Sequence, residues 1–528
     1  MVLRVWFAVA ALAASLVACG DGALHPVVRD HQRGGSASCE GCAFPGEPIV
    51  VVPPAGPEIP LDVRDRFGPL GSEEPTGGPC LLEPQLGSLF PNNWLRPRFR
   101  WSAPLRPSYF ELRLSVDVEP NDLVVYTSAT SWTMDPEIWR ALLAHAAGRS
   151  IAVSVRSLEV GATRPALGST GKISIAPVPA PGSIVYWSIT AETDATYLKG
   201  FQVGEESVAT VVRPTPGRCV GCHASTPDGE YVAYSDADLP EAQGQFASLA
   251  LRSRRDGVSE PTFLTSAGRA LLARRNQHLP AFSPAHWRAG DRLVLSLLNL
   301  RFVWTDLEAT SQAAGVGSGP LVLDGDPGGM PAWPAWSHDG SFLVYASGAG
   351  TIAGGILTGA DIYRVPFDDK RGGAATPLAG ASDPAWNEFY PALSPDDRLV
   401  AFSRVRLEDG DSYNNRHAEV FVVPAAGGEP VRLAANDPGP CEGATSPGVT
   451  NSWPKWSPEV TVTGGKAYYF LTFSSTRAGR VPQLYVAPVV RLGESDQLET
   501  FPALYLWNQP EIEGNHTPAW DAFQIPFQ

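Results

Sequence analysis

A short motif recurs six times between residues 181 and 528, and its spacing constrains the fold more than any other feature of the chain. Each copy has a Pro or a substitute, two further residues and then Ser or a substitute, usually followed by turn residues and a strand-like run. The Ser positions are 226, 283, 337, 394, 457 and 521, separated by 57, 54, 57, 63 and 64 residues. Each interval has room for one four-stranded sheet, so the spacing predicts a repeating all-β fold.

The order of elements inside each interval is also constant. In the third interval the motif is followed by the runs FLVYAS (342–347), DIYRVPF (361–367) and ATPL (375–378). Asp-Gly and Asp-Asp pairs after the motif favour tight hairpin turns. The Trp or Phe before the Ser position is interpreted as packing between neighbouring sheets.

The motif resembles the signature of TolB-like six-bladed β-propellers, a W-S-P-D-G turn followed by a short strand. PAWSHDG (334–340) and PALSPDD (391–397) carry the resemblance most clearly. The resemblance implies one propeller domain over residues 181–528. Only one strand follows the sixth motif, so we expect the runs within 183–212 to complete the sixth blade and close the ring, which removes exposed sheet edges.

The segment before the repeats reads as a second β domain. In residues 80–180, Phe110, Leu112 and Leu114 alternate with polar residues, and further strand-like runs follow. This segment resembles an immunoglobulin- or fibronectin-type sandwich, with a short helix expected around Asp135–Leu143. Residues 20–79 are rich in Gly and Pro and are interpreted as a flexible tether, in which Cys39 and Cys42 are expected to form a local disulfide. The predicted fold class is therefore all-β, a six-bladed β-propeller preceded by an immunoglobulin/fibronectin-like sandwich.

Residues 1–19 read as a signal peptide, with a basic start, a short apolar run and a small-residue end. Leu16-Val17-Ala18-Cys19 resembles the bacterial lipobox, which implies lipidation of Cys19. The alternative is an ordinary signal peptide with a chance Cys. We expect an exported protein, anchored by lipid to the periplasmic or cell-surface side of the envelope. The formal net charge is −15 and no block of Lys and Arg stands out, so nucleic acid is not expected as a partner.

The stretch Cys219-Val-Gly-Cys222-His223 has the spacing by which c-type haem is attached, with two thiols for the porphyrin and a His for the iron. His223 stands where the other five repeats have Pro. His278 and His516 each lie five residues before a Ser position and are candidate further ligands, with Met330 a weaker one. The sequence thus predicts haem c at Cys219, Cys222 and His223. The alternatives are a Cys219–Cys222 disulfide, pairing with Cys441, or a metal such as zinc held by Cys and His.

The sequence contains no hydrolase elbow, zinc-protease helix or phosphate loop, so no enzyme activity is expected. Asp409–Asn414 resembles a calcium loop only loosely and is interpreted as a turn between strands. TolB-like propellers bind envelope proteins at a propeller face, and the resemblance implies a non-catalytic scaffold for an envelope protein or a peptidoglycan-associated partner. The alternatives are a haem-dependent redox or sensor protein and a structural Cys/His site without haem.

Overall fold

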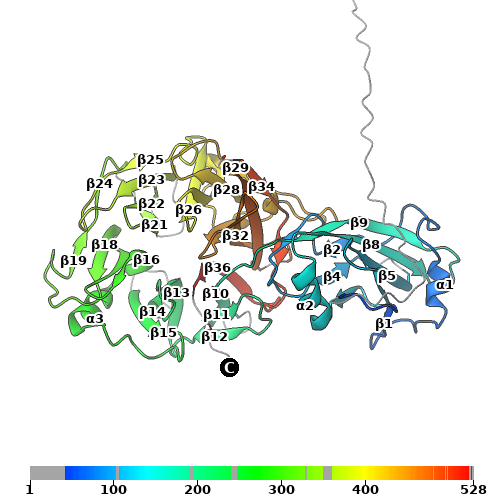
Figure 1. Cartoon of the computed structure of the whole chain (residues 1–528). Helices are drawn as coiled ribbons and strands as arrows, with labels where there is room; N and C mark the ends of the chain where they lie inside the picture. Colours follow the sequence, from blue (N-terminus) through cyan, green and yellow to red (C-terminus); the bar gives the residue numbers. More distant parts are fainter. Residues whose placement is uncertain are drawn as a thin grey trace, which may run out of the picture.

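The computed structural model describes residues 42–102, 106–190, 195–238, 247–327, 330–348, 359–479, 481–493, 495, 497–522 and 525. Their secondary structure is mostly strand, as the sequence predicts. Figure 1 shows two parts: strands β1–β9 form one body beside a ring of sheets built from β10 to β36. No helix in the described part of the chain is long and apolar enough to cross a membrane. The predicted signal peptide, Cys19 and Cys39 lie outside the described residues.

The first part contains a six-stranded sheet and a three-stranded sheet. The order of the larger sheet is β1 (Ile49–Val51), β6 (Leu123–Thr127), β5 (Ser108–Ser115), β8 (Ser150–Glu159), β9 (Ala166–Ile175) and β3 (Leu89–Phe90). The smaller sheet has the order β2 (Leu81–Glu83), β4 (Arg98–Trp101) and β7 (Ser131–Thr133). Trp101 on β4 packs against Phe110 on β5, with ring centroids 5.6 Å apart, so the two sheets share a core.

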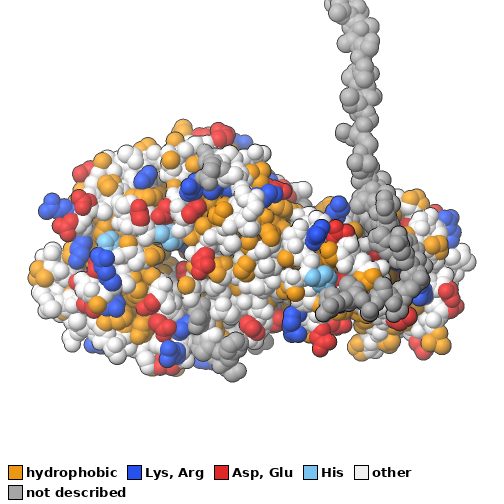
Figure 2. Space-filling view, in the orientation of Figure 1, with side chains coloured by type: hydrophobic (Ala, Val, Ile, Leu, Met, Phe, Trp, Pro, Cys, Tyr) orange, Lys and Arg blue, Asp and Glu red, His pale blue; other side chains and the backbone are white. Residues whose placement is uncertain are grey.

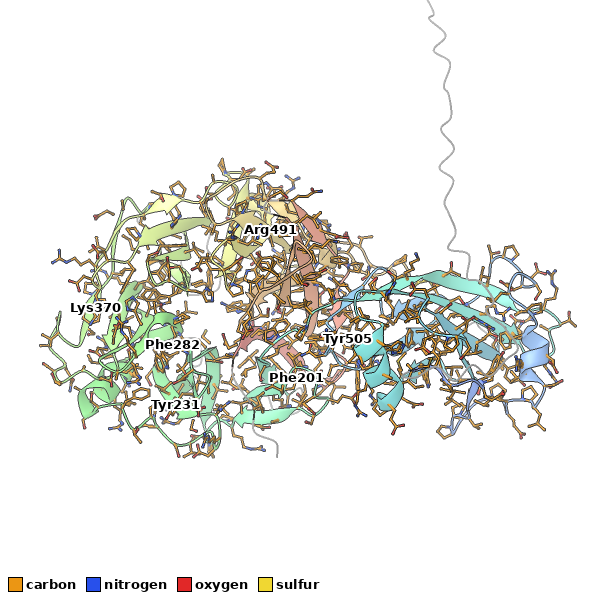
Figure 3. All side chains as sticks on the ribbon, viewed as in Figure 1. Phe201, Tyr231, Phe282, Lys370, Arg491 and Tyr505 are labelled. Atoms are coloured by element: carbon orange, nitrogen blue, oxygen red, sulfur yellow. A yellow bond between two sulfur atoms is a disulfide. The ribbon has the colours of Figure 1, made fainter. Side chains whose placement is uncertain are left out.

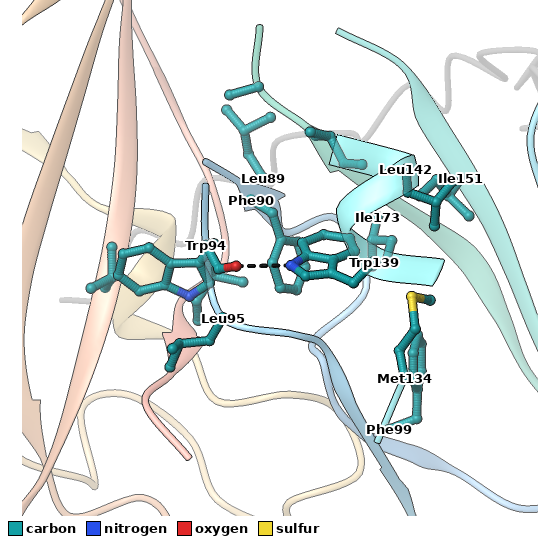
Figure 4. Close-up of a cluster of buried hydrophobic side chains, with 14 of the residues drawn as sticks. Leu89, Phe90, Trp94, Leu95, Phe99, Met134, Trp139, Leu142, Ile151 and Ile173 are labelled. Carbon is teal, nitrogen blue, oxygen red and sulfur yellow. Dashed lines mark hydrogen bonds between the residues drawn. The ribbon is translucent and has the colours of Figure 1, made fainter. Parts of the chain in front are cut away.

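The predicted helix is confirmed as α2 (Pro136–His145), which buries Trp139 and Leu142. The Trp139 indole N–H donates to the carbonyl of Trp94 at 2.8 Å (Figure 4). The hydrogen bond satisfies the polar atom of a side chain that is otherwise enclosed by Leu, Ile and Phe, which is the usual condition for burying Trp.

The structure differs from the predicted tether over its second half. Strand β1 pairs in parallel with β6, and helix α1 (Val63–Phe67) buries Val63 and Phe67. The two side chains pack with Tyr126 and other residues of the large sheet. These apolar residues are too few and too scattered among Gly and Pro to produce a periodic pattern, so their burial depends on a sheet formed later in the chain.

Six sheets make up the ring within the described residues, apart from the small parallel pair β20 (Val322–Asp324) and β24 (Gly372–Ala374). Sheet one is β13 (Arg218–Ser225), β14 (Tyr231–Asp238) and β15 (Ser248–Ser253), followed by helix α3 (Ser266–Leu272). Sheet two is β16 (Gln277–Arg288), β17 (Asp291–Leu298), β18 (Arg301–Asp306) and β19 (Ser318–Pro320). Sheet three is β21 (Ala332–Trp336), β22 (Phe342–Ser347), β23 (Asp361–Pro366) and β25 (Thr376–Pro377).

Sheet four is β26 (Trp386–Leu393), β27 (Leu399–Arg406), β28 (Glu419–Pro424) and β29 (Val431–Arg432), with 3-10 turns at Leu407–Asp409 and Ala434–Asn436. Sheet five is β30 (Asn451–Trp456), β31 (Thr461–Thr463), β32 (Lys466–Ser475), β33 (Gln483–Leu492), β34 (Leu498–Thr500) and β35 (Leu504–Tyr505). Sheet six is β12 (Ala209–Val212), β11 (Thr196–Gln202), β10 (Ser183–Ile189) and β36 (Gly514–Asp521).

The ring is closed by both ends of the repeat region, and the predicted pairing is confirmed. Strand β36 pairs antiparallel with β10, from Ser183 opposite Asp521 to Ile189 opposite Gly514. We call the motif strands β13, β16, β21, β26, β30 and β36 the inner strands, since they contact one another in that order and β36 returns to β13. The closed order leaves each sheet with a neighbour on both faces.

The recurring Ser position stabilises the turn that follows the inner strand in several of the motifs. The Ser337 amide donates to the carbonyl of Phe342, and the Phe342 amide donates to the Ser337 hydroxyl. Ser394 makes the corresponding contacts with Leu399. A hydroxyl at this position closes the hairpin in these motifs, whereas the Ser283 hydroxyl has no hydrogen-bond partner among the described residues.

The two parts are joined by a disulfide and by a continuous core. Cys80 is disulfide-bonded to Cys441, across 361 residues of sequence. Trp94 packs near Trp520 with ring centroids 6.1 Å apart, and the Trp507 indole donates to the carbonyl of Arg96 at 2.8 Å. Figure 3 shows Tyr505 at the junction, where its ring lies 5.5 Å from the Arg98 guanidinium carbon. Cys42 is also disulfide-bonded.

Candidate binding site at the centre of the ring

Every inner strand carries a bulge at the same place. The register against its partner strand shifts just before the Ser position in all six described inner strands. Four residues before that position, five of the strands place a non-glycine residue at positive φ: Leu279 (54°), Trp333 (50°), Tyr390 (54°), Trp453 (62°) and Thr517 (47°). A bulge re-aims the side chain that it carries, so these residues point differently from the rest of their strands.

Four of these side chains, all except Thr517, line a pocket where five inner strands meet. The pocket, which we call the central pocket, has a volume of about 50 Å³. Its lining residues are Cys222, His223, Leu279, Pro280, Trp333, Pro334, Tyr390, Pro391, Trp453 and Lys455. The residues come from β13, β16, β21, β26 and β30, so the pocket exists only when the ring is assembled.

One wall of the central pocket is aromatic. The ring of Tyr390 lies 4.6 Å from that of Trp333 and 4.0 Å from that of Trp453, measured between centroids. Tyr390 is buried, whereas both Trp side chains remain partly exposed. A bulky residue at positive φ costs roughly 1–3 kcal/mol, and such strain is concentrated at functional sites. The aromatic wall is therefore held in place at a cost to stability.

His223 lies on the opposite wall and has an unused ring nitrogen. Its Nε2 contacts the carbonyl oxygen of Val185 on β10 at 3.2 Å, which identifies Nε2 as the protonated nitrogen. Its buried Nδ1 has no hydrogen-bond partner among the described residues. Burial lowers the pKa of His223 to about 4, and the positive charge of Lys455 acts in the same direction. At neutral pH, His223 is thus uncharged and offers an acceptor at Nδ1.

Lys455 provides a cation at the central pocket. Burial lowers the pKa of its amine, while the carboxylate of Asp521 partly offsets that effect. No carboxylate oxygen in the described part of the chain lies within 4.0 Å of the amine. Burying a charge without a close partner is costly. The amine is therefore available to an anionic group that enters the pocket.

A loop from sheet four reaches a neighbouring part of the ring. Tyr413 lies between β27 and β28, and its hydroxyl oxygen lies 3.2 Å from Nε2 of His516, within hydrogen-bond distance. The ring of His516 also packs against Trp187 with centroids 4.4 Å apart. Burial lowers the pKa of His516 to about 3, with a smaller contribution from His223. The segment Asp409–Asn414, interpreted as a turn, therefore brings an aromatic hydroxyl to the ring centre.

The prediction of haem c is wrong. The described residues contain no group of three or more His, Cys, Asp and Glu side chains arranged to hold a metal ion. Cys219 and Cys222 are free thiols that contact different sheets: the Thr196 hydroxyl on β11 lies 3.4 Å from Cys219 Sγ, whereas Cys222 lies against Ser235 and the backbone of Leu279. Burial raises the pKa of the Cys222 thiol. The motif spacing alone could not reveal this, because the bulge at Cys222 changes the direction of the chain.

The other candidate ligands are separated by the fold. His278 lies on β16 opposite Leu297 and does not line the central pocket, and Met330 packs against the core near Phe389. The structure brings His223 and His516 into electrostatic contact but not His278. Cys441 pairs with Cys80, which excludes its pairing with Cys219 or Cys222.

Sequence reasoning missed Lys455 and Tyr413. The signal for Lys455 was present, since the residue two before the Ser position is Ala224, Ala281, Ala335, Ala392 or Ala519 in the other five repeats. Lys455 and His223 are thus exceptions to the repeat pattern that meet in one pocket. Tyr413 had no such signal, because it lies in a loop between motifs and its contact with His516 spans 103 residues.

A larger pocket, of about 370 Å³, lies between the two parts of the molecule. Its charged groups already have partners: Arg98 pairs with Glu83 at 2.8 Å and with Glu511 at 3.2 Å. Arg477 donates to the carbonyls of Ala435 and Asn436. The polar groups of this pocket therefore stabilise the junction, and we consider the central pocket the better candidate site.

No family model matches the sequence, and no curated protein matches it. Solved structures with a similar fold include a putative TolB from Agrobacterium tumefaciens, 15% identical, with 63% of this chain covering 97% of that chain at a TM-score of 0.31. An oligogalacturonate lyase from Vibrio parahaemolyticus is 14% identical over 61% of this chain and 74% of its own, at 0.29. A DUF4784 family protein from Bacteroides caccae is 8% identical over 84% of this chain and 98% of its own, at 0.29. These values support no assignment of activity or ligand.

Proposed function

We propose that this chain is an exported, non-catalytic binding protein whose central pocket receives an envelope partner. In this proposal the ring is a six-bladed propeller, the first part is a sandwich that is fixed to it, and lipidation of Cys19 anchors the chain to the membrane. The partner is an envelope protein or a peptidoglycan-associated component. Figure 2 supports the exclusion of nucleic acid, since acidic and basic side chains are interspersed over the visible face of the ring.

The observation that carries the proposal is the set of strained residues at the centre. Five inner strands hold Leu279, Trp333, Tyr390, Trp453 and Thr517 at positive φ. A ring that served only as a structural spacer would gain stability from Gly or Asn at these positions. Four of these positions carry Leu, Trp or Tyr, which favours a binding role, because rigid aromatic side chains offer contact area at low entropic cost.

The disulfide supports export. Cys80 and Cys441 are paired across the junction, and such bonds persist in oxidising compartments such as the bacterial periplasm. The disulfide also ties the first part to the ring, so we expect both parts to meet the partner as one unit.

Co-purification from detergent-solubilised envelopes tests the proposal. The wild-type chain is compared with a Trp333→Ala/Trp453→Ala variant, and Val258→Ala, at a residue 73% exposed, is the control. We expect the double variant to lose a specific envelope component at least tenfold while the control retains it, because only the former removes the aromatic wall. Identical recovery from all three proteins would show that the central pocket is not the binding surface.

A further inference from the structure

The central pocket combines three kinds of group on three walls, and together they specify a ligand more closely than a general binding role. Lys455 supplies a cation, and no carboxylate oxygen of the described residues lies within 4.0 Å of it, although the charge of Asp521 acts on it. His223 supplies a buried acceptor, Nδ1, that has no hydrogen-bond donor among the described residues. Trp333, Tyr390 and Trp453 supply an aromatic surface. Each of the two polar groups replaces an apolar residue that stands at the same position in the other five repeats, so neither is required to build the ring.

These three groups are complementary to a ligand that carries a carboxylate, an N–H donor and an aromatic ring close together. A carboxylate would pair with the Lys455 amine, and in a partly desolvated site such a pair is stronger than on the surface. A neighbouring N–H would donate to His223 Nδ1, which is uncharged at neutral pH. A ring would pack against the Trp and Tyr side chains. An aromatic residue at the carboxyl end of a peptide chain carries a carboxylate, an amide N–H and a ring on adjacent atoms.

We propose that the central pocket binds the carboxyl terminus of a polypeptide that ends in an aromatic residue. The proposal rests on the proposed binding function and names the chemical group that the partner inserts. Capture of a chain terminus is a recurring mode of peptide recognition. The central pocket is narrow, about 50 Å³, and so admits a chain end rather than an extended protein surface.

A matched pair of small probes isolates the charge of the terminus. N-acetylphenylalanine has the carboxylate, the N–H and the ring, and N-acetylphenylalaninamide has an uncharged carboxamide in place of the carboxylate. Binding of both to the purified full chain is measured by calorimetry. We expect the acid to bind at least tenfold more tightly than the amide. Equal affinity of the two probes for the wild-type chain, or binding of neither at millimolar concentration, would overturn the proposal.

Variants at Lys455 then locate the preference. Lys455→Ala introduces the residue found at this position in the other five repeats, so the inner strand should still form. We expect it to bind acid and amide equally. Lys466→Met, at a surface lysine 3.9 Å from Glu499, is the matched control and should keep the wild-type preference. If Lys455→Ala fails to fold, Lys455→Met, which keeps the length of the side chain without the charge, replaces it.

A third variant tests the role of the histidine. His223→Phe removes the acceptor but keeps a planar ring, and we expect it to weaken binding of the acid while leaving the ratio of acid to amide affinity unchanged.

Two outcomes distinguish this proposal from the proposed function. Retention of the acid preference in Lys455→Ala would contradict the proposal even if an envelope partner were found. Loss of envelope co-purification with intact probe binding would instead contradict the proposed function.

Discussion

At the scale of single residues, the ring centre is defined by departures from its own repeat. The inner strands have Pro and Ala at the two positions that His223 and Lys455 occupy in β13 and β30. Pro and Ala bring no polar side-chain atoms, whereas His223 brings a buried Nδ1 that has no hydrogen-bond partner among the described residues and Lys455 brings an amine. A substitution that lowers stability without improving the fold is explained most simply by binding.

The low pKa of His223 predicts a specific dependence of stability on pH. Its pKa is about 4 in the folded chain, against 6.5 for an unperturbed side chain. Below pH 6.5 the imidazole is protonated in the unfolded chain but stays neutral in the folded chain. The free energy of unfolding is therefore highest above pH 6.5 and falls as the pH falls toward 4. Denaturant unfolding at pH 7 and pH 5 should show the wild type losing roughly 2 kcal/mol more than His223→Gln over this interval.

The exposed His417 provides the matched control, and His417→Gln should follow the wild type across the same range. Parallel loss of stability in the wild type and in His223→Gln would show that the imidazole of His223 is not held neutral by burial.

At the scale of elements, the sequence predicted the strands that follow from local patterns of residues. The Pro-to-Ser spacing identified the inner strands, and the runs within 183–212 were correctly assigned as partners of the last motif. The bulges were not predictable, because a register shift is a property of two strands rather than one. For the same reason β1 and α1 were missed, since Val63 and Phe67 are buried only by residues such as Tyr126.

Removal of β36 tests the closure of the ring. Deleting residues 515–528 takes away most of β36 and exposes the edge of β10 and one face of β13. We expect cooperative thermal unfolding to be lost, or the protein to aggregate, because an unpaired strand edge invites association. Deletion of residues 526–528 leaves β36 and Ile525 in place and is the control. A melting transition as sharp and as high as that of the control would refute closure by these strands.

At the scale of the whole molecule, His223 and Lys455 lie at the central pocket, whereas the first part of the molecule is attached to the ring at a different surface. The junction uses Trp94, Trp507 and the Cys80–Cys441 disulfide, whereas the central pocket is lined by β13, β16, β21, β26 and β30. The disulfide closes a loop of 361 residues and makes the two parts one unit. The central pocket is therefore free to receive a partner while the first part is fixed to the ring.

Site-specific photo-crosslinking tests the central claim most directly. A benzophenone amino acid replaces Leu279, which lines the central pocket at a position where three other repeats already carry Trp or Tyr. The control carries the same group at Val462, which is 68% exposed on β31. After irradiation in intact cells, we expect a discrete envelope adduct from position 279 that is absent from position 462 and reduced by Lys455→Ala. Adducts of equal yield from both positions, or none from position 279, would contradict binding at the central pocket.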